Sequence, residues 1–207
     1  FGSGHSVISV MDLFPRYGSY VGFVPIMDAR LMWTTVVGSG GAVEVIWQER
    51  QEGYAEVMMR GRKLNRGDTM LIYSHGGMNA APVEMALIAK EKGLPVIGVT
   101  SVANRQINDP GHSSGKSLHD IADVVIDNCS PPEDAVVPIE GVIGNVGATS
   151  TLTAVAVTMA LLSETSAKLA ELGKMPERVF VSPNVPGVTK ANNFIVYEDY
   201  IAFRDNR

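Results

Sequence analysis

Short runs of apolar residues recur along the chain, each bounded by glycine, proline or polar residues. Runs of about five residues that are apolar throughout are typical of strands buried on both faces of a parallel sheet. Three clear runs lie in the middle of the chain, and two weaker ones lie nearer its ends. The pattern predicts strands at residues 21–26, 69–73, 95–99, 123–127 and 179–182.

Between these runs, apolar residues recur every three or four positions, which is the period of a helix with one buried face. The clearest of these segments is followed by Gly93, at the position where helices commonly end in a left-handed residue. Helices are predicted at 7–17, 47–60, 80–92, 118–122 and 149–172, with weaker helical character at 183–207. Loops are expected at 34–42, 74–79, 100–117 and 128–146.

Strands that alternate with helices along a chain indicate βαβ units. We therefore expect an α/β protein, a three-layer α/β/α sandwich with a mainly parallel, flavodoxin-like sheet. At 207 residues the chain is long enough for one sizeable core, and no linker divides it, so a single domain over 1–207 is predicted. A loop such as Gly2 to Ser6 normally follows a complete strand, so we also expect a further segment before Phe1.

Charge, cysteine content and the length of apolar runs indicate which partners and which compartment to expect. The formal net charge is −5 and the basic residues are scattered, whereas nucleic-acid binding needs clustered Lys and Arg. The single cysteine, Cys129, allows no internal disulfide, which favours a reducing, cytoplasmic compartment. The longest apolar stretch, 152–162, is shorter than the roughly 20 residues that span a bilayer. We expect neither a nucleic-acid partner nor a membrane.

Two familiar cofactor motifs are incomplete. Gly2 and Gly4 would need a third glycine at position 7 for the dinucleotide fingerprint, but that position is Val7. Residues 111–117 resemble a nucleotide-binding P-loop, but three residues separate the two glycines where that motif has four. The 4 histidines show no paired spacing for a metal. No cofactor and no metal are expected.

Three loops share one arrangement, at residues 3–6, 74–79 and 100–101. The second and third follow predicted strands, and the first would follow the strand expected before Phe1. Each opens a helix, where unpaired N–H groups and the positive helix dipole attract anions. Hydroxyls of Ser6, Ser74 and Ser101 can donate to phosphate oxygens. The alternative is that these serines serve only as helix N-caps.

The segment Ser74-His75-Gly76-Gly77-Met78-Asn79 resembles the Ser-x-Ser-Gly-x-Ser/Thr phosphate loop of sugar isomerase (SIS) domains. FGSGHS at 1–6 resembles their first loop, and Thr149-Ser150-Thr151 resembles their third site. Nearly the whole chain is similar to an uncharacterised bacterial group of SIS proteins related to phosphoheptose isomerase. This similarity is carried by residues 1–6, 49–57, 79–87, 112–118 and 123–129. In the second loop, Gly76 and Asn79 replace hydroxyl residues of the usual motif.

The resemblance implies a phosphorylated sugar as ligand and a homodimer or higher homo-oligomer as assembly. Together with the loop pattern, it predicts the phosphosugar-binding residues Ser3, Gly4, Ser6, Ser74, His75, Gly76, Gly77, Asn79, Thr100, Ser101, Thr149, Ser150 and Thr151.

The residues that catalysis would need depart from the pattern of the family. Aldose–ketose isomerisation needs a base that moves a proton between adjacent carbons, and a second group that moves protons on the oxygens. Phosphoheptose isomerases are expected to use a Glu late in the first helix and a Gln and a His on the last long helix. Here the first helix has only Asp12, and 154–162 contains neither Gln nor His.

The acid–base candidates therefore come from elsewhere: His5, His75, His112, Glu49, Glu52 and Glu56. Of these we select His5, Glu52 and His112. Glu49, Glu52 and Glu56 would share one face of the predicted helix 47–60, where a solvated face is the alternative. For His112 the alternative is a mobile surface loop. Two functions remain open, an isomerase (or related epimerase or lyase) acting on a sugar phosphate, and a non-catalytic module that senses one.

Overall fold

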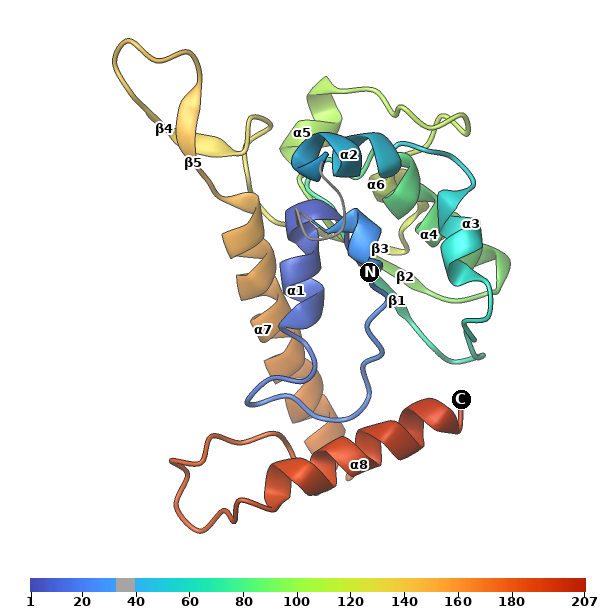
Figure 1. Ribbon diagram of the computed structural model, residues 1–207, viewed down its shortest axis with the longest axis vertical. Helices are drawn as coiled ribbons and strands as arrows, with labels where there is room; N and C mark the ends of the chain where they lie inside the picture. The colour runs from blue at the N-terminus through green and yellow to red at the C-terminus, as the bar shows by residue number, and fades with distance from the viewer. Residues whose placement is uncertain (33–39) are drawn as a thin grey trace.

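A computed structural model describes residues 1–32 and 40–207 (Figure 1). Its main sheet has the strands β1 (Met70–Tyr73), β2 (Val96–Thr100) and β3 (Val124–Asp127), all parallel and in the order β1-β2-β3. Gly2 forms a parallel bridge with Tyr73, so the start of the chain extends the sheet beyond β1. The three clear apolar runs are thus confirmed as strands.

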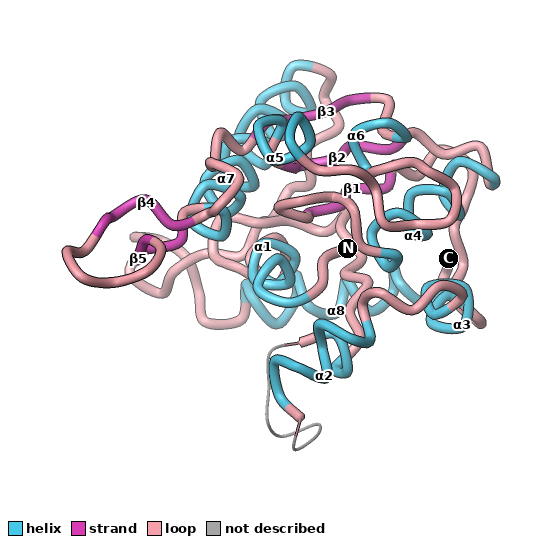
Figure 2. Tube along the Cα trace, turned by 90° about the horizontal axis from the view of Figure 1, so that it is seen from above, coloured by secondary structure: helices cyan, strands magenta, loops and turns pink. Residues whose placement is uncertain are grey.

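Helices cover both faces of this sheet, as the view from above makes clear (Figure 2). One face packs against α3 (Tyr54–Met59), α4 (Ala80–Glu91) and α6 (Leu118–Ile121), and the other against α1 (Val7–Met11) and α7 (Ser150–Glu171). Along β1, Met70 and Ile72 enter the first core while Leu71 and Tyr73 enter the second. Because strand side chains alternate between faces, a strand covered on both sides must be apolar throughout. The predicted three-layer α/β/α fold is confirmed.

The remaining elements are shorter or lie at the periphery. They are η1 (Gly4–Ser6), η2 (Ala29–Leu31), α2 (Gly41–Gln48), α5 (Val102–Ile107), β4 (Ala135–Pro138), β5 (Asn145–Ala148) and α8 (Asn192–Asp205). β4 and β5 pair antiparallel and form a hairpin that projects from the body (Figure 1). This hairpin lies in the predicted loop 128–146, α5 lies in the predicted loop 100–117, and α8 confirms the weak helical signal of the tail.

Two predicted strands are wrong. Residues 21–26 and 179–182 form no strand. Instead the backbone of Phe180 pairs with a turn near the start of the chain, accepting from Gly18 N (2.6 Å) and donating to Ser19 O (2.8 Å). Phe180 joins Phe14 and Val196 in a small core beneath α8. These segments are apolar because they pack against one another and α8, not because they belong to the sheet.

Two predicted helices also have different bounds. The segment 47–60 is broken, because α2 ends at Gln48 and α3 begins after Gly53, whose φ of +84° is unsuited to a helix. The first helix ends at Met11 instead of residue 17, and Pro15 could not donate to a continuing helix. Gly93 is confirmed as the left-handed residue after α4, with φ of +73°. Residues 34–39 of the predicted loop 34–42 lie outside the described residues.

α7 is a long, apolar helix that packs against the sheet. Among residues 1–32 and 40–207 it alone is long and apolar enough to cross a bilayer, and 17% of its most apolar stretch is buried. The buried hydroxyls of Thr158 on α7 and Tyr73 on β1 are hydrogen-bonded at 2.8 Å. Together with Ala154, these contacts hold the helix against the sheet.

Candidate functional site

The loops predicted to hold phosphate meet at one edge of the sheet. Ser74 and Ser101 directly follow the parallel strands β1 and β2, and Ser3 follows the short pairing beside β1. Carboxyl ends of parallel strands lie at the same edge, where open α/β sheets bind their ligands. We call this edge, formed by residues 3–6, 74–79 and 100–101, the cradle.

Glu49 joins two loops of the cradle. Its Oε2 accepts a hydrogen bond from Ser3 Oγ (2.7 Å) and its Oε1 accepts one from Asn79 Nδ2 (2.7 Å). The Glu49 carbonyl also accepts from Ala81 N in the first turn of α4 (2.9 Å). Burial raises the pKa of Glu49, opposed by the Ser3 hydrogen bond and the charge of Arg50. A desolvated carboxylate thus lies between the first loop and the second.

The second loop is held in a tight turn. Ser74 Oγ accepts from Gly77 N (3.1 Å), and the Gly77 carbonyl accepts from Leu118 N (2.7 Å). Gly77 has a φ of +64°, and a Cβ there would lie 3.0 Å from Thr100 Oγ1 and 3.1 Å from the Leu118 Cβ. Glycine is required at this position for both its conformation and its size.

His75 connects the second loop to the third. Its carbonyl accepts from Thr100 Oγ1 (3.0 Å) and Ser101 N (2.9 Å). The ring Nε2 lies 3.2 Å from the Pro132 carbonyl and 3.4 Å from Asn104 Nδ2, which itself donates to that carbonyl (3.1 Å). In the described residues Nδ1 has no hydrogen-bond partner. His75 therefore orders the cradle and keeps one buried ring nitrogen without a hydrogen bond within the described residues.

The start of α7 is tied to the same region. Ser101 Oγ donates to the Ser130 carbonyl (2.6 Å), and Ser130 Oγ lies 3.1 Å from Thr153 Oγ1 on the first turn of α7. The predicted ligand residues Thr149 and Ser150, however, bind a protein carboxylate. Both of their backbone N–H groups donate to Asp134 Oδ1, at 2.9 and 2.7 Å.

Asp134 therefore acts as the cap of α7. Ser150 Oγ donates to its Oδ2 (2.8 Å). Burial acts to raise the pKa of Asp134, but the hydrogen bonds from Ser150 and Thr149 outweigh it, and the pKa is lowered. Thr151 lies within α7 directly after these two residues.

The three catalytic candidates fall in two places. Glu52 and His112 lie together, with His112 Nε2 3.8 Å from Glu52 Oε2 and 3.8 Å from Glu84 Oε1. Ser113 donates to Glu52 through its backbone N (2.7 Å) and its Oγ (2.5 Å), and these bonds lower the pKa of Glu52. His5 is exposed within η1, between Ser3 and Ser6.

The break in the predicted helix 47–60 separates the three glutamates. Glu49 and Glu52 lie in the turn between α2 and α3, and Glu56 is exposed on α3, so they share no helical face. Glu84 accepts from the backbone N–H groups of Gly53 and Ala55, and so caps α3.

Sequence reasoning missed the roles of Glu49, Glu84, Asn104, Ser130 and Asp134. Only Glu49 carried a usable signal, since it was already a candidate acid. The others contact residues that are distant in sequence, so no spacing identifies them. In the described residues, no group of three or more His, Cys, Asp or Glu side chains is arranged to hold a metal.

Comparison with known proteins relates this chain to SIS domains and to UPF0309 proteins. A family model described as SIS domain matches residues 1–101, which include the whole cradle. A UPF0309 protein of Caldanaerobacter subterraneus subsp. tengcongensis is 35% identical over 194 residues, covering 93% of this chain and 76% of the relative. UPF0309 proteins of Halalkalibacterium halodurans (34% identical, 95% and 76% covered) and Brucella anthropi (35% identical, 95% and 77% covered) are similarly related.

Proposed function

Because the chain belongs to the UPF0309 family of SIS domain proteins, we propose that it binds a phosphorylated sugar in the cradle and isomerises it. Phosphosugar binding is the general function that an SIS domain implies. The observation that supports catalysis is Glu49, a carboxylate with a raised pKa held between Ser3 and Asn79.

The phosphate group would lie over the loop 74–79, at the start of α4. The positive end of this 12-residue helix points toward the loop, and Ser74 and Asn79 add polar groups without any arginine. Gly77 allows the backbone to fold closely over Thr100. The predicted residues Ser3, Gly4, Ser6, Thr100 and Ser101 complete the cradle from the two neighbouring loops.

Glu49 has the properties of the base that isomerisation needs. A carboxylate with a raised pKa accepts a proton from carbon more readily at neutral pH than an ordinary glutamate does. In the proposed step Glu49 removes a proton from the carbon beside the carbonyl and returns it to the adjacent carbon. His5 carries the accompanying proton from the hydroxyl to the carbonyl oxygen, so the reaction needs no oxidant or reductant.

We assign the base to Glu49 in preference to Glu52 because of their burial. Each carboxylate accepts two hydrogen bonds, but Glu49 is half-buried and its pKa is raised, whereas Glu52 is exposed and its pKa is lowered. His112 Nε2 lies 3.8 Å from a carboxylate oxygen of Glu52 and of Glu84, and its Nδ1 accepts from Ser114 N (3.1 Å). Their contacts suit a role in holding the loop 108–117 beside the cradle.

A non-catalytic sensor is the second candidate function. It is favoured by α7, which has neither Gln nor His at 154–162, and whose Ala154 and Thr158 face the core. A sensor would bind the same ligand through the same loops, so binding alone does not separate the two functions.

Thermal shift with a panel of phosphorylated sugars and their unphosphorylated counterparts tests binding. Any ligand that stabilises the protein is then followed by NMR in deuterated water. Stabilisation with deuterium entering the sugar is the expected result, and stabilisation without it would leave the sensor. No stabilisation by any phosphosugar would contradict both functions. Ser74→Trp should abolish the shift, while Ser163→Trp, on the exposed side of α7, should keep it.

We also propose that the protein forms a homo-oligomer in the cytoplasm. The β4–β5 hairpin exposes apolar side chains on both of its faces, and an isolated two-stranded hairpin is marginally stable in water. The exposed residues are Val136, Val137, Ile139, Val142, Ile143 and Val146. Light scattering should find an oligomer that Ile143→Lys dissociates.

The exposed free thiol of Cys129 supports the proposal of a reducing compartment. The net charge of −5 supports a role without nucleic acid.

A further inference from the structure

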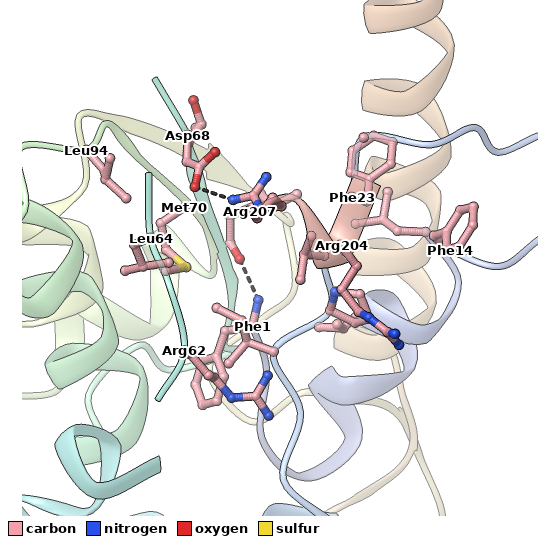
Figure 3. Close-up of a pocket in the computed structure, with 18 of the residues that line it drawn as sticks. Phe1, Phe14, Phe23, Arg62, Leu64, Asp68, Met70, Leu94, Arg204 and Arg207 are labelled. Carbon is pink, nitrogen blue, oxygen red and sulfur yellow. Dashed lines mark hydrogen bonds and ion pairs between the residues drawn. The ribbon is translucent and has the colours of Figure 1, made fainter. Parts of the chain in front are cut away.

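A cavity of about 910 Å³ lies apart from the cradle, near the end of the sheet where β1 begins (Figure 3). Its walls come from the segment 61–70, from α7 and from α8 at the end of the chain. The volume is near the upper end of the range of small-molecule sites. None of the residues of the cradle loops lines it, so it is a separate site.

The inner wall of this cavity is apolar. Figure 3 displays Phe14 and Phe23 on one side and Leu64, Met70 and Leu94 on the other. Met70 and Leu94 are buried parts of the main core, so this wall is fixed by the fold. Such a surface favours an aliphatic or aromatic body over a sugar.

The charged residues of the cavity are mostly basic. Arg62, Lys63, Arg204 and Arg207 line it, against the single carboxylate of Asp68. This excess of positive charge is opposite in sign to the net charge of −5 of the whole chain. A ligand with an anionic group would therefore be attracted to this end of the molecule.

Two of these four cations already have carboxylate partners. Arg207 is paired with Asp68 (Figure 3), and Arg204 Nε lies 2.8 Å from Asp205 Oδ1. Arg62 donates to the Met27 carbonyl at 3.3 Å. Within the described part of the chain, neither Arg62 nor Lys63 has a carboxylate partner, and both are exposed.

We propose that this cavity binds an amphipathic anion, a fatty acid whose chain lies against Met70, Leu94 and Phe23 and whose carboxylate pairs with Arg62 and Lys63. The apolar wall accounts for the chain, and the two unpaired cations account for the charge. Each methylene buried strengthens binding about threefold to fourfold, so chain length dominates affinity. The site is independent of phosphosugar binding.

Isothermal titration calorimetry of the 207-residue chain with laurate, below its micelle concentration, tests the proposal. Dodecyltrimethylammonium has the same chain with the opposite charge, and butyrate has the same head group with a short chain. Laurate should bind, and the other two should bind at least tenfold more weakly. Raising the salt concentration should weaken laurate binding, because exposed charges are screened. Equal binding of the cationic amphiphile would overturn the proposal.

Variants locate the site. Lys63→Glu and Arg62→Glu should each weaken laurate binding at least fivefold, while Arg178→Glu, an exposed arginine outside the cavity, should leave it unchanged. Thr69→Trp, at an exposed lining position, should block entry without altering a charge. If a charge-reversed variant melts early, Thr69→Trp still decides. No laurate binding, or binding that no variant weakens, would mean that the cavity does not hold a fatty acid.

Discussion

Replacing Glu49 by glutamine should separate catalysis from binding in the cradle. Glutamine keeps the size of the side chain and removes its charge. Its oxygen can still accept from Asn79 Nδ2, and its amide can donate to Ser3 Oγ, so both contacts now made at 2.7 Å have a neutral counterpart. The loops should therefore keep their positions, while the proposed base is lost.

The expected losses follow from this geometry. General base catalysis contributes a factor of about 10²–10⁴, so isomerisation should fall by at least ~100-fold. Phosphosugar binding should change by less than about fivefold, because glutamine can still accept the hydrogen bond from Asn79 in the phosphate loop. Glu49→Ala differs, because hydrogen bonds to a charged group contribute about 1.5–3 kcal/mol each and alanine loses both. The alanine variant should therefore lose stability as well as activity.

The pH dependence of stability gives an independent check. The pKa of Glu49 is raised in the folded protein, so the folded state binds this proton more tightly than the unfolded state does. The favourable contribution is present below the unfolded pKa and is lost as pH rises through the folded pKa. The Tm of Glu49→Gln relative to wild type should therefore increase between pH 4 and pH 7.5.

Three measurements on the same samples complete the test. They are deuterium incorporation into the sugar by NMR, phosphosugar affinity by calorimetry, and Tm against pH. Glu52→Gln is the matched control, since it neutralises an exposed carboxylate in the same turn. Full turnover in Glu49→Gln would refute the assignment of the base. A Tm difference that falls with pH would refute the reasoning about its desolvation.

Three substitutions elsewhere test the fold, each by urea unfolding against wild type. Gly77→Ala should cost about 1–2 kcal/mol, because alanine is strained at φ +64° and its Cβ would lie 3.0 Å from Thr100 Oγ1; an unchanged midpoint would contradict this. Asp134→Asn should cost about 1–2 kcal/mol at pH 7. The pKa of Asp134 is lowered, so this difference should vanish only as pH falls below the ordinary aspartate range, and a constant difference would count against the cap. Tyr73→Phe should cost about 0.5–1.5 kcal/mol by removing the buried hydrogen bond to Thr158, and no loss would mean that bond is unimportant.

The central strands could be read from the sequence because their environment is simple. A parallel strand covered by helices on both sides must be apolar at every position, and residues 70–73 of β1 and 96–99 of β2 fit this rule. β3 lies at the edge of the sheet, where Val124 is 51% exposed, and its run of Val124, Val125 and Ile126 was enough to predict a strand. Residues 21–26 and 179–182 have the same character for another reason, since they pack beneath α8. An apolar segment is expected to be buried, but its composition does not show whether it packs in the sheet or against a helix.

The candidate site was predictable only in part. The loops 74–79 and 100–101 follow strands that had been located, so their shared edge followed from the parallel order of the strands. The loop 3–6 joins them through the bridge between Gly2 and Tyr73, which no apolar run before it had indicated. Glu49 was misplaced, because the pattern of 47–60 suits a continuous helix and the break at Gly53 depends on contacts with Glu84 on α4. The cap formed by Asp134 depends on the hairpin that brings this residue back to Ser150.

By itself the sequence determined the alternation of strands and helices and the serine- and glycine-rich loops, because local periodicity and turn chemistry are written in neighbouring residues. Only the tertiary structure decided which polar groups face one another at the cradle. Ser3, Glu49 and Asn79 are separated by dozens of residues, and no local rule relates them. Their meeting depends on how the turn after α2 packs against α4, and that packing decides which carboxylate is desolvated and which remains in water.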